Sequence, residues 1–258
     1  MGVFSLRILV TGSTGQLGSI LFKQLKASDY KVKITSRRKP EGIGHFEWVY
    51  SDLSSGEGLE AAVKDVDVII HAATSPIKNS KMVEVLGFKE FLGKMKHIKH
   101  LIYPSIVGVD EIPFKYYKQK YEAEELLKNC SIPHTIVRAT QFHNFVENLF
   151  ISKPLCKRYI VPGNFKFQSV DAGEFASHLI GLVGKDPQGR AEDFCGPDIM
   201  TLKEMAELKI KKNNESNKVL SISFPGKLYK SFSEGKNTNS LRKMGEITFG
   251  DYLSNKLE

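Results

Sequence analysis

The feature that most constrains this chain is the run Thr11-Gly12-Ser13-Thr14-Gly15-Gln16-Leu17-Gly18, which directly follows the apolar residues Ile8-Leu9-Val10. A strand that turns into a helix through glycines spaced GxxGxxG forms a cradle for phosphate. The backbone approaches a pyrophosphate closely only where Cβ atoms are missing, and a helix N-terminus supplies N–H donors and a partial positive charge. The run therefore predicts a dinucleotide-binding fold at the start of the chain, with Gly12 to Gly18 as cofactor-binding residues.

A tight strand-to-helix turn without a ligand is the plainer interpretation of the same residues. The phosphate cradle is favoured because the motif requires a buried strand before it and an amphipathic helix after it. Leu17, Ile20, Leu21 and Leu25 recur at helical spacing and supply that helix.

Apolar runs and amphipathic stretches alternate along the first part of the chain, as in βαβ units. The expected strands are residues 7–10, 31–35, 46–49, 66–70, 101–103 and 135–137, and the expected helices are residues 16–27, 59–63, 82–95 and 116–128. This order predicts an α/β protein with a Rossmann-type, doubly wound parallel sheet of six or more strands.

After about residue 145 the pattern loosens. We expect helices over 174–183 and 248–257, a strand over 216–224, and a helix from Thr201 to about Lys211. Glu204, three residues after Thr201, completes a capping box. The organisation predicted is an NAD(P)-binding Rossmann domain over 1–150 and a smaller C-terminal lobe over 151–258, which completes the substrate crevice within one compact unit.

Composition excludes several classes of protein. The chain has 258 residues and a net charge of +8, but its lysines are spread out, and no helix-turn-helix, zinc-finger or RNA-binding signature is present. We interpret the charge as a solvated surface, with a basic cleft for an anionic cofactor as the alternative. No run approaches the roughly 20 apolar residues of a membrane span. Cys130, Cys156 and Cys195 fit neither a disulfide framework nor a metal site. We therefore expect a cytoplasmic protein with no metal, nucleic-acid or membrane partner.

The end of the second strand indicates which dinucleotide is bound. In this fold a carboxylate there binds the free ribose hydroxyl of NAD, whereas an arginine accommodates the 2′-phosphate of NADP. Ser36-Arg37-Arg38 stands at that place without a carboxylate. The sequence thus predicts that NADP(H) is preferred and NAD(H) is possible. Solvated turn arginines are the alternative.

Two further segments are predicted to contact the cofactor. Asp52 and Leu53, after the third strand, resemble the Asp-Leu pair that lies near the adenine in the short-chain dehydrogenase/reductases, with an exposed turn as the competing interpretation. Ala72, Ala73 and Thr74 follow the fourth strand, where small residues let the backbone pass close to a ligand. His71 just before them is interpreted as a packed, hydrogen-bonded histidine.

The glycine run, in the form TGxTGxLG, resembles the extended and atypical branches of the short-chain dehydrogenase/reductase superfamily. That resemblance implies a tyrosine that gives a proton to a carbonyl while the nicotinamide gives a hydride, and a lysine one helical turn later that lowers the pKa of the tyrosine. Tyr116 and Lys120 match this pair, and Glu124 extends the match to YxxxKxxxE. Lys120 is also expected to hold the nicotinamide ribose. Ser105, at the end of the fifth strand, is the expected ligand of the substrate oxygen.

Each of these assignments has a structural alternative. Tyr252 and Lys256 also match YxxxK, so only its position after the fifth strand favours the first pair. Tyr116 and Lys120 would otherwise belong to a surface helix, and Ser105 to a turn.

The segment from Arg138 to Phe145 ends the sixth strand, at the sheet edge where ligands bind. Gln141, Phe142 and Phe145 are predicted to line a pocket for a flat apolar substrate. Core packing is the alternative for Phe142 and the favoured interpretation for His143.

Together these motifs resemble the NmrA-like NAD(P)-binding proteins, an atypical branch that includes both reductases and sensors. The resemblance implies an NADPH-preferring oxidoreductase that passes hydride to a small carbonyl, quinone or similar acceptor, as a monomer or homodimer. A non-catalytic redox sensor is the alternative, and a sugar-nucleotide epimerase or dehydratase is a third.

Overall fold

The computed structural model describes residues 6–256, and its central element is a seven-stranded sheet. The strands are β1 (Arg7–Thr11), β2 (Lys31–Ser36), β3 (Glu47–Tyr50), β4 (Val68–His71), β5 (His100–Ile106), β6 (His134–Ala139) and β9 (Gly189–Arg190). Their order is β3-β2-β1-β4-β5-β6-β9, and the registered pairs are parallel. The predicted doubly wound Rossmann-type sheet is confirmed. The chain order reverses between β1 and β4, and ligands bind outside the carboxyl ends of strands at such a switch point.

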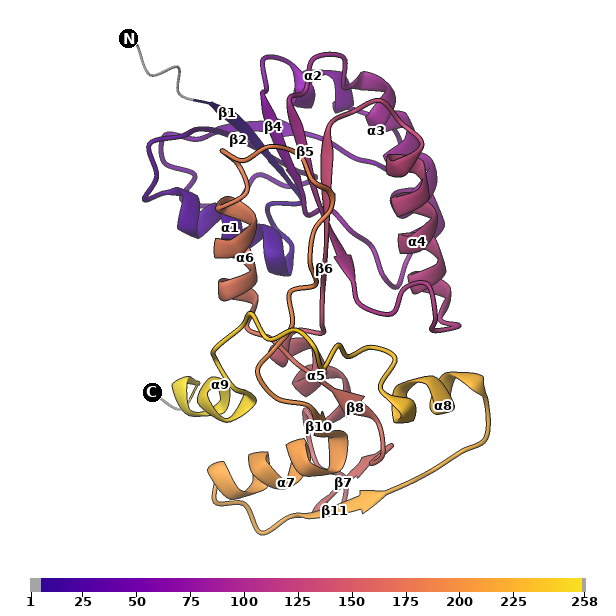
Figure 1. The fold of residues 1–258 in the computed structure, drawn as a ribbon. Helices are drawn as coiled ribbons and strands as arrows, with labels where there is room; N and C mark the ends of the chain where they lie inside the picture. The colour runs from indigo at the N-terminus through magenta and orange to yellow at the C-terminus, as the bar shows by residue number, and fades with distance from the viewer. Residues whose placement is uncertain (1–5, 257–258) are drawn as a thin grey trace. The chain divides into compact units, whose positions relative to one another are not determined.

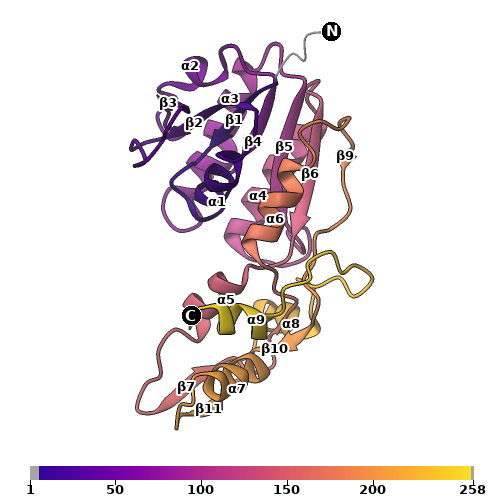
Figure 2. The same ribbon diagram turned by 90° about the vertical axis from the view of Figure 1, so that its left-hand side faces the viewer.

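Helices cover both faces of this sheet. They are α1 (Gln16–Leu25), α2 (Leu59–Val63), α3 (Phe88–Lys94), α4 (Lys115–Lys128) and α6 (Ala172–Ile180). Figure 1 shows α3 and α4 on one face and α1 with α6 on the other. In Figure 2, α1 and α6 lie in front of the strands. Because both faces are covered, the central strands are apolar, and Ile8, Leu9 and Val10 are fully buried.

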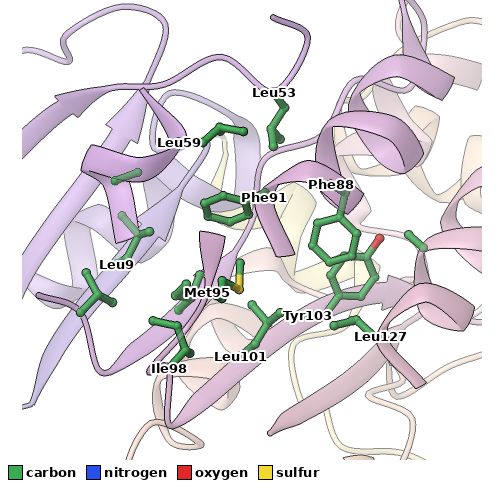
Figure 3. Close-up of a cluster of buried hydrophobic side chains, with 14 of the residues drawn as sticks. Leu9, Leu53, Leu59, Phe88, Phe91, Met95, Ile98, Leu101, Tyr103 and Leu127 are labelled. Atoms are coloured by element: carbon green, nitrogen blue, oxygen red, sulfur yellow. The ribbon is translucent and has the colours of Figure 1, made fainter. Parts of the chain in front are cut away.

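The core between the sheet and α2, α3 and α4 is aliphatic at one end and aromatic at the other (Figure 3). Leu9 of β1 and Leu101 of β5 contribute to the aliphatic part. The rings of Phe88 and Tyr103 lie face to face at a tilt, with centroids 5.0 Å apart. This packing fixes α3 against β5.

One predicted helix is wrong in detail. Residues 82–95 were expected to form a single α-helix, but Met82–Gly87 form a π-helical turn, and α3 begins at Phe88. Gly87 lies so close to the chain after β3 that a Cβ there would be 1.9 Å from the Leu53 carbonyl oxygen. The helix therefore depends on glycine where it crosses this segment.

The described chain divides into two compact units that interleave along the sequence. The first takes in the residues up to Ser105 together with 118–137 and 176–191, and the second takes in 106–117, 138–175 and the residues from Glu192 onward. The division at residue 150 expected from the sequence stays a prediction.

The second unit contains two small sheets and four helices among its described residues. The strands β7 (Arg158–Val161) and β11 (Lys218–Ser221) pair in parallel, and β8 (Lys166–Phe167) pairs antiparallel with β10 (Met200–Thr201). The helices are α5 (His143–Phe150), α7 (Leu202–Lys212), α8 (Lys227–Glu234) and α9 (Phe249–Asn255). The capping box of Thr201 and Glu204 at α7 is confirmed. The strand expected over 216–224 is only four residues long, and Leu257 lies outside the described residues.

A buried carboxylate joins three helices of the second unit. Glu147 of α5 accepts hydrogen bonds from Lys209 Nζ of α7 at 2.8 Å, Tyr252 Oη of α9 at 2.6 Å and Lys256 Nζ at 2.8 Å. Burial by itself raises the pKa of Glu147, but these bonds overcome it and lower that pKa from 4.5 to about 2. The second YxxxK pair of the sequence thus holds α9 in place.

None of the helices between residues 6 and 256 has both the length and the apolar composition needed to cross a membrane.

We predict that Glu147→Gln lowers the free energy of unfolding by roughly 3–5 kcal/mol, because it leaves the buried Lys209 ammonium without its counter-ion. Urea unfolding at neutral pH measures this loss. Glu207→Gln on the exposed side of α7 is the matched control, with an expected change within about 0.5 kcal/mol. Because the folded-state pKa of Glu147 lies below its ordinary value, its contribution is present above about pH 4.5 and is lost as the pH falls toward about 2. Equal losses in the two variants would contradict this account.

Candidate active site

Two of the three glycines in the β1–α1 turn are required by packing. Gly12 has a left-handed backbone, φ +65°, and a Cβ there would lie 2.6 Å from Ala73 Cα, in the segment after β4. A Cβ at Gly18 would lie 2.1 Å from the Gly12 carbonyl oxygen. These contacts bring β1, the start of α1 and the segment after β4 together at the switch point of the sheet.

Gly15 differs from the other two. A Cβ there would meet only the Gly12 oxygen, at 3.2 Å, which is tight but far from an overlap. Gly15 is the N-cap residue of α1, where it provides no side-chain cap, and the first turn of α1 has no acidic residue. The helix N-terminus thus keeps its partial positive charge for an anion, as the phosphate cradle requires.

The other residues of this turn divide between inward and outward positions. Ser13 is buried, and both its N–H and its Oγ donate to the Thr35 carbonyl oxygen of β2, at 3.0 and 3.2 Å. Thr14 and Gln16 are exposed, and Leu17 is half-buried. Ser13 therefore fixes the turn against β2, while Thr14 and Gln16 lie on its outer surface.

At the end of β2, a serine holds the turn that presents two arginines. Ser36 Oγ donates to the Arg38 carbonyl oxygen at 2.5 Å and accepts from Trp48 Nε1 at 3.1 Å. Arg37 and Arg38 are exposed, and neither has an ion-pair partner among residues 6–256. Their guanidinium groups are available to an external phosphate, and Ser36 acts in the structure as a turn-forming residue.

The two side chains after β3 that were predicted to contact the adenine, Asp52 and Leu53, make contacts within the protein. Asp52 Oδ1 accepts from the Ser54 N–H at 2.8 Å and from Ser54 Oγ at 2.7 Å, which closes a turn. The Leu53 side chain belongs to the hydrophobic core (Figure 3). A dinucleotide would meet the Asp52 carboxylate only on its remaining oxygen.

The segment after β4 is hydrogen-bonded to β1. Thr11 Oγ1 accepts from the Ala73 N–H at 3.1 Å and lies 3.1 Å from His71 Nδ1. Burial, together with the charge of Lys120, lowers the pKa of His71 to about 3, so the imidazole is neutral at neutral pH. His71 packs among Phe88, Phe91 and Tyr103, as expected for a core histidine.

Lys120 is the most unusual residue of the predicted site, because its ammonium group is buried. It is 4% exposed, it donates to the Pro104 carbonyl oxygen at 2.9 Å, and Nζ lies 4.0 Å from the centroid of the Tyr103 ring. Burial lowers the pKa of Lys120, and the nearby carboxylates of Glu84 and Glu124 oppose that effect.

Ser105 directly follows the carbonyl that Lys120 binds. Its hydroxyl is buried, and Ser105 Oγ has no hydrogen-bond partner within the described part of the chain. An unpaired buried hydroxyl is costly, and it often marks a ligand-binding position. The first unit therefore brings Lys120 and Ser105 together at the carboxyl end of β5.

The remaining predicted residues belong to the second unit. Tyr116, in the first turn of α4, is half-buried, whereas Tyr117 is buried and accepts a hydrogen bond from Gln141 Nε2. Burial raises the pKa of Tyr117. Phe145 is 39% exposed, and the ring centroid of Phe142 lies 5.9 Å from that of Phe175. The pairing of Gln141 with Tyr117 was not predicted.

His143 is a packing residue, as the sequence favoured. It is buried, its Nδ1 lies 2.8 Å from Ser169 Oγ, and its Nε2 lies 3.0 Å from the Ile247 carbonyl oxygen. Between residues 6 and 256, no group of three or more His, Cys, Asp or Glu side chains is placed to hold a metal ion.

Sequence reasoning missed Glu84. Its carboxylate is buried beside Lys120, with Glu84 Oε2 3.8 Å from Lys120 Nζ. One signal was present in the sequence: Glu84 has helical spacing to Phe88, Phe91 and Met95, so it is the single charge on an apolar face.

A hollow of about 540 Å³ lies at the opposite end of the sheet, beside Arg7 of β1 and Lys31 of β2. It adjoins the amino ends of these strands, where the fold does not place its ligands. We therefore locate the candidate site from the side chains at the carboxyl ends of the strands, and not from this hollow.

Comparison with known proteins agrees with the dinucleotide-binding fold. A family model described as NAD(P)H-binding matches residues 12–150, which is more than half of the chain. The bifunctional pinoresinol-lariciresinol reductase 2 of Thuja plicata is 25% identical over 250 residues, which are 85% of this chain and 79% of that protein. Two further reductases of that type from the same plant are matched over about half their length, 52% and 50%.

Two other matches are informative. The subunit 9 of the NADH dehydrogenase [ubiquinone] 1 alpha subcomplex of Arabidopsis thaliana is 23% identical over 84% of this chain and 60% of that protein. The NADPH-dependent quinone oxidoreductase QOR2 of Escherichia coli, solved with NADPH, superposes with a TM-score of 0.82 over 97% of this chain and 100% of that chain, at 16% identity. At that identity the likeness shows the fold.

The chain belongs to the NAD(P)H-binding family. Several proteins that it is similar to are named as reductases or oxidoreductases, which agrees with the resemblance of its sequence motifs to the atypical, NmrA-like short-chain dehydrogenase/reductases.

We predict that Gly18→Ala and Gly15→Ala impair different properties, the first the stability of the fold and the second the binding of NADPH. Gly18→Ala destabilises the fold by about 1–3 kcal/mol, since its Cβ would overlap the Gly12 carbonyl. Gly15→Ala folds with a loss below about 1 kcal/mol but weakens NADPH binding at least about tenfold, because its methyl group obstructs the pyrophosphate. Thermal unfolding and calorimetric titration measure the two effects. Unchanged NADPH binding by Gly15→Ala would show that the cradle holds no phosphate.

Proposed function

We propose that this chain is an NADPH-preferring reductase that transfers a hydride to a small quinone or carbonyl acceptor. One observation carries the proposal: the buried Lys120 ammonium binds the carbonyl of Pro104, next to the unpartnered hydroxyl of Ser105. A positive charge and a hydroxyl donor at one strand end suit an oxygen atom that gains negative charge during reduction.

The proposed reaction divides into a hydride transfer and a proton transfer. When bound, the reduced nicotinamide supplies the hydride, that is, two electrons and one proton. Ser105 Oγ donates a hydrogen bond to the acceptor oxygen, and Tyr116 supplies the second proton. Lys120 lies one helical turn after Tyr116 on α4, and its positive charge stabilises the ionised Tyr116 that this transfer leaves. Solvent then returns a proton to Tyr116. Gln141, Phe142 and Phe145 bind the flat face of the acceptor.

The exposed arginines support the preference for NADPH. Arg37 and Arg38 follow β2, where the fold places the adenosine ribose, and no carboxylate stands there to bind a free 2′-hydroxyl. The turn that Ser36 and Trp48 hold presents both guanidinium groups to solvent. A 2′-phosphate would gain charge-assisted hydrogen bonds from them.

A non-catalytic NAD(P)-binding protein is the second candidate. It is favoured by the engagement of Lys120 with Pro104, Glu84 and Tyr103 within the protein itself. The similarity to subunit 9 of the NADH dehydrogenase [ubiquinone] 1 alpha subcomplex also fits a binding role. This candidate predicts dinucleotide binding without turnover.

We predict that Tyr116→Phe lowers kcat with a quinone or carbonyl acceptor by about 10²–10⁴-fold, the range of general acid catalysis, with little change in NADPH affinity. Steady-state oxidation of NADPH across a panel of acceptors measures the effect. Tyr121→Phe, on the same helix, is the control and keeps wild-type turnover. Full activity of Tyr116→Phe would remove the tyrosine from the mechanism, and absence of turnover by the wild type would favour the second candidate.

We predict that Arg37→Ala and Arg38→Ala each weaken NADPH binding by about 10–100-fold, since each removes a charge-assisted hydrogen bond worth roughly 1.5–3 kcal/mol. NADH, which lacks the 2′-phosphate, is expected to lose less than about threefold. Calorimetric titration with both dinucleotides measures the difference, and Lys39→Ala is the control for a nearby exposed charge. Equal weakening of both dinucleotides would refute the assignment.

A further inference from the structure

Glu84 has two carboxylate oxygens with different partners. Oε1 accepts hydrogen bonds from Thr74 Oγ1 at 2.6 Å and from the Ser75 N–H at 2.7 Å. Oε2 lies 3.8 Å from Lys120 Nζ. Thr74 and Ser75 follow β4, and Lys120 belongs to α4. A single side chain thus connects two segments on which the proposed function depends.

The local backbone places this carboxylate inward. Glu84 lies in the π-helical turn Met82–Gly87, whose exposed side chains Met82 and Leu86 lie on the opposite side. Turns of this kind are rare and occur often at functional sites. Removing one partner of a buried ion pair leaves an uncompensated charge, so the Glu84 carboxylate is tied to the charge of Lys120.

The charge of Lys120 requires compensation. Around its ammonium group lie the Pro104 carbonyl, the Tyr103 ring, the Glu84 carboxylate, the Glu124 carboxylate and the neutral His71. Burial disfavours the ammonium form, and the two carboxylates are the charges that favour it. Glu84 forms an ion pair with Nζ, with Oε2 at 3.8 Å.

We propose that Glu84 is a positioning residue of the active site, which holds the Lys120 ammonium and the segment after β4 in one buried, hydrogen-bonded cluster. Glu84 keeps Lys120 charged and directed at the carboxyl end of β5, and it fixes Thr74 and Ser75 beside the cofactor segment Ala72–Ala73. The role of Glu84 in catalysis rests on the proposed function, because it requires that Lys120 takes part in reduction. The effect of Glu84 on the charge of Lys120 does not depend on turnover.

The test is the titration of Lys120 in Glu84→Gln, followed by the Nζ and Cε chemical shifts of isotope-labelled lysine and assigned by the signal lost in Lys120→Arg. Glutamine keeps the shape and the acceptor for Thr74 and Ser75 but removes the charge. The pKa of Lys120 is expected to fall by about one to three pH units, as for loss of an opposite charge within 4–6 Å. Glu122→Gln, an exposed position on α4, leaves the Lys120 titration unchanged. An unaltered Lys120 titration in Glu84→Gln would overturn the proposal.

Two further measurements complete the test. The alkaline limb of the pH profile of kcat/KM is expected to move to lower pH in Glu84→Gln by the same amount as the Lys120 titration, an effect that a purely structural role would not produce. If Glu84→Gln fails to fold, the wild-type protein still decides the question, since a Lys120 that is neutral at pH 7.5 would overturn the proposal. Wild-type protein without turnover on any acceptor would instead refute the proposed function alone.

Discussion

Two backbone segments approach each other closely at Gly12, and this contact determines how the β1–α1 turn packs against the segment after β4. A Cβ at Gly12 would lie 2.6 Å from Ala73 Cα, so only glycine lets the β1–α1 turn pack against the segment after β4. Thr11 strengthens the same junction by accepting a hydrogen bond from Ala73. Because β1 and β4 flank the switch point of the sheet, this junction forms the floor of the crevice in which a Rossmann fold binds its ligand. The uncapped N-terminus of α1 lies directly beside it and supplies the charge that an anion needs.

A second constraint is the buried charge of Lys120. Taking an ammonium group out of water costs several kcal/mol, and a protein keeps such a group only where other polar groups compensate it. Here the compensation comes from a carbonyl of β5, an aromatic ring and the carboxylate of Glu84. In the second unit the buried Glu147 carboxylate accepts hydrogen bonds from three side chains of its own unit, and both of its oxygens are engaged. The Glu147 cluster is therefore a structural network. The Lys120 cluster lies beside the unpartnered Ser105 hydroxyl, and it is the candidate active site.

Sequence reasoning succeeded where the signal is local. The strand-to-helix turn at the glycine run, the order of the first six strands, and the capping box of Thr201 and Glu204 are each encoded within a few consecutive residues, and the structure confirms them. It failed where distant residues meet. The partners of Glu147 are 62, 105 and 109 residues away, so nothing in the sequence showed that Tyr252 and Lys256 hold a helix in place. Glu84 and Lys120 are likewise joined only by the fold, and the π-helical turn that carries Glu84 has the same apolar periodicity as an ordinary helix. The assignments of Tyr116, Ser105 and the dinucleotide contacts stay predictions.

We propose that the β1–α1 turn holds the pyrophosphate of a reduced dinucleotide. The decisive measurement is a titration of the wild-type protein with NADPH, followed by the fluorescence of the reduced nicotinamide. We expect saturable binding of one dinucleotide per chain, with inorganic pyrophosphate competing for the same site. Fluorescence that rises only linearly with NADPH, with no saturation and no competition, would contradict the claim and reduce the glycine turn to a purely structural feature.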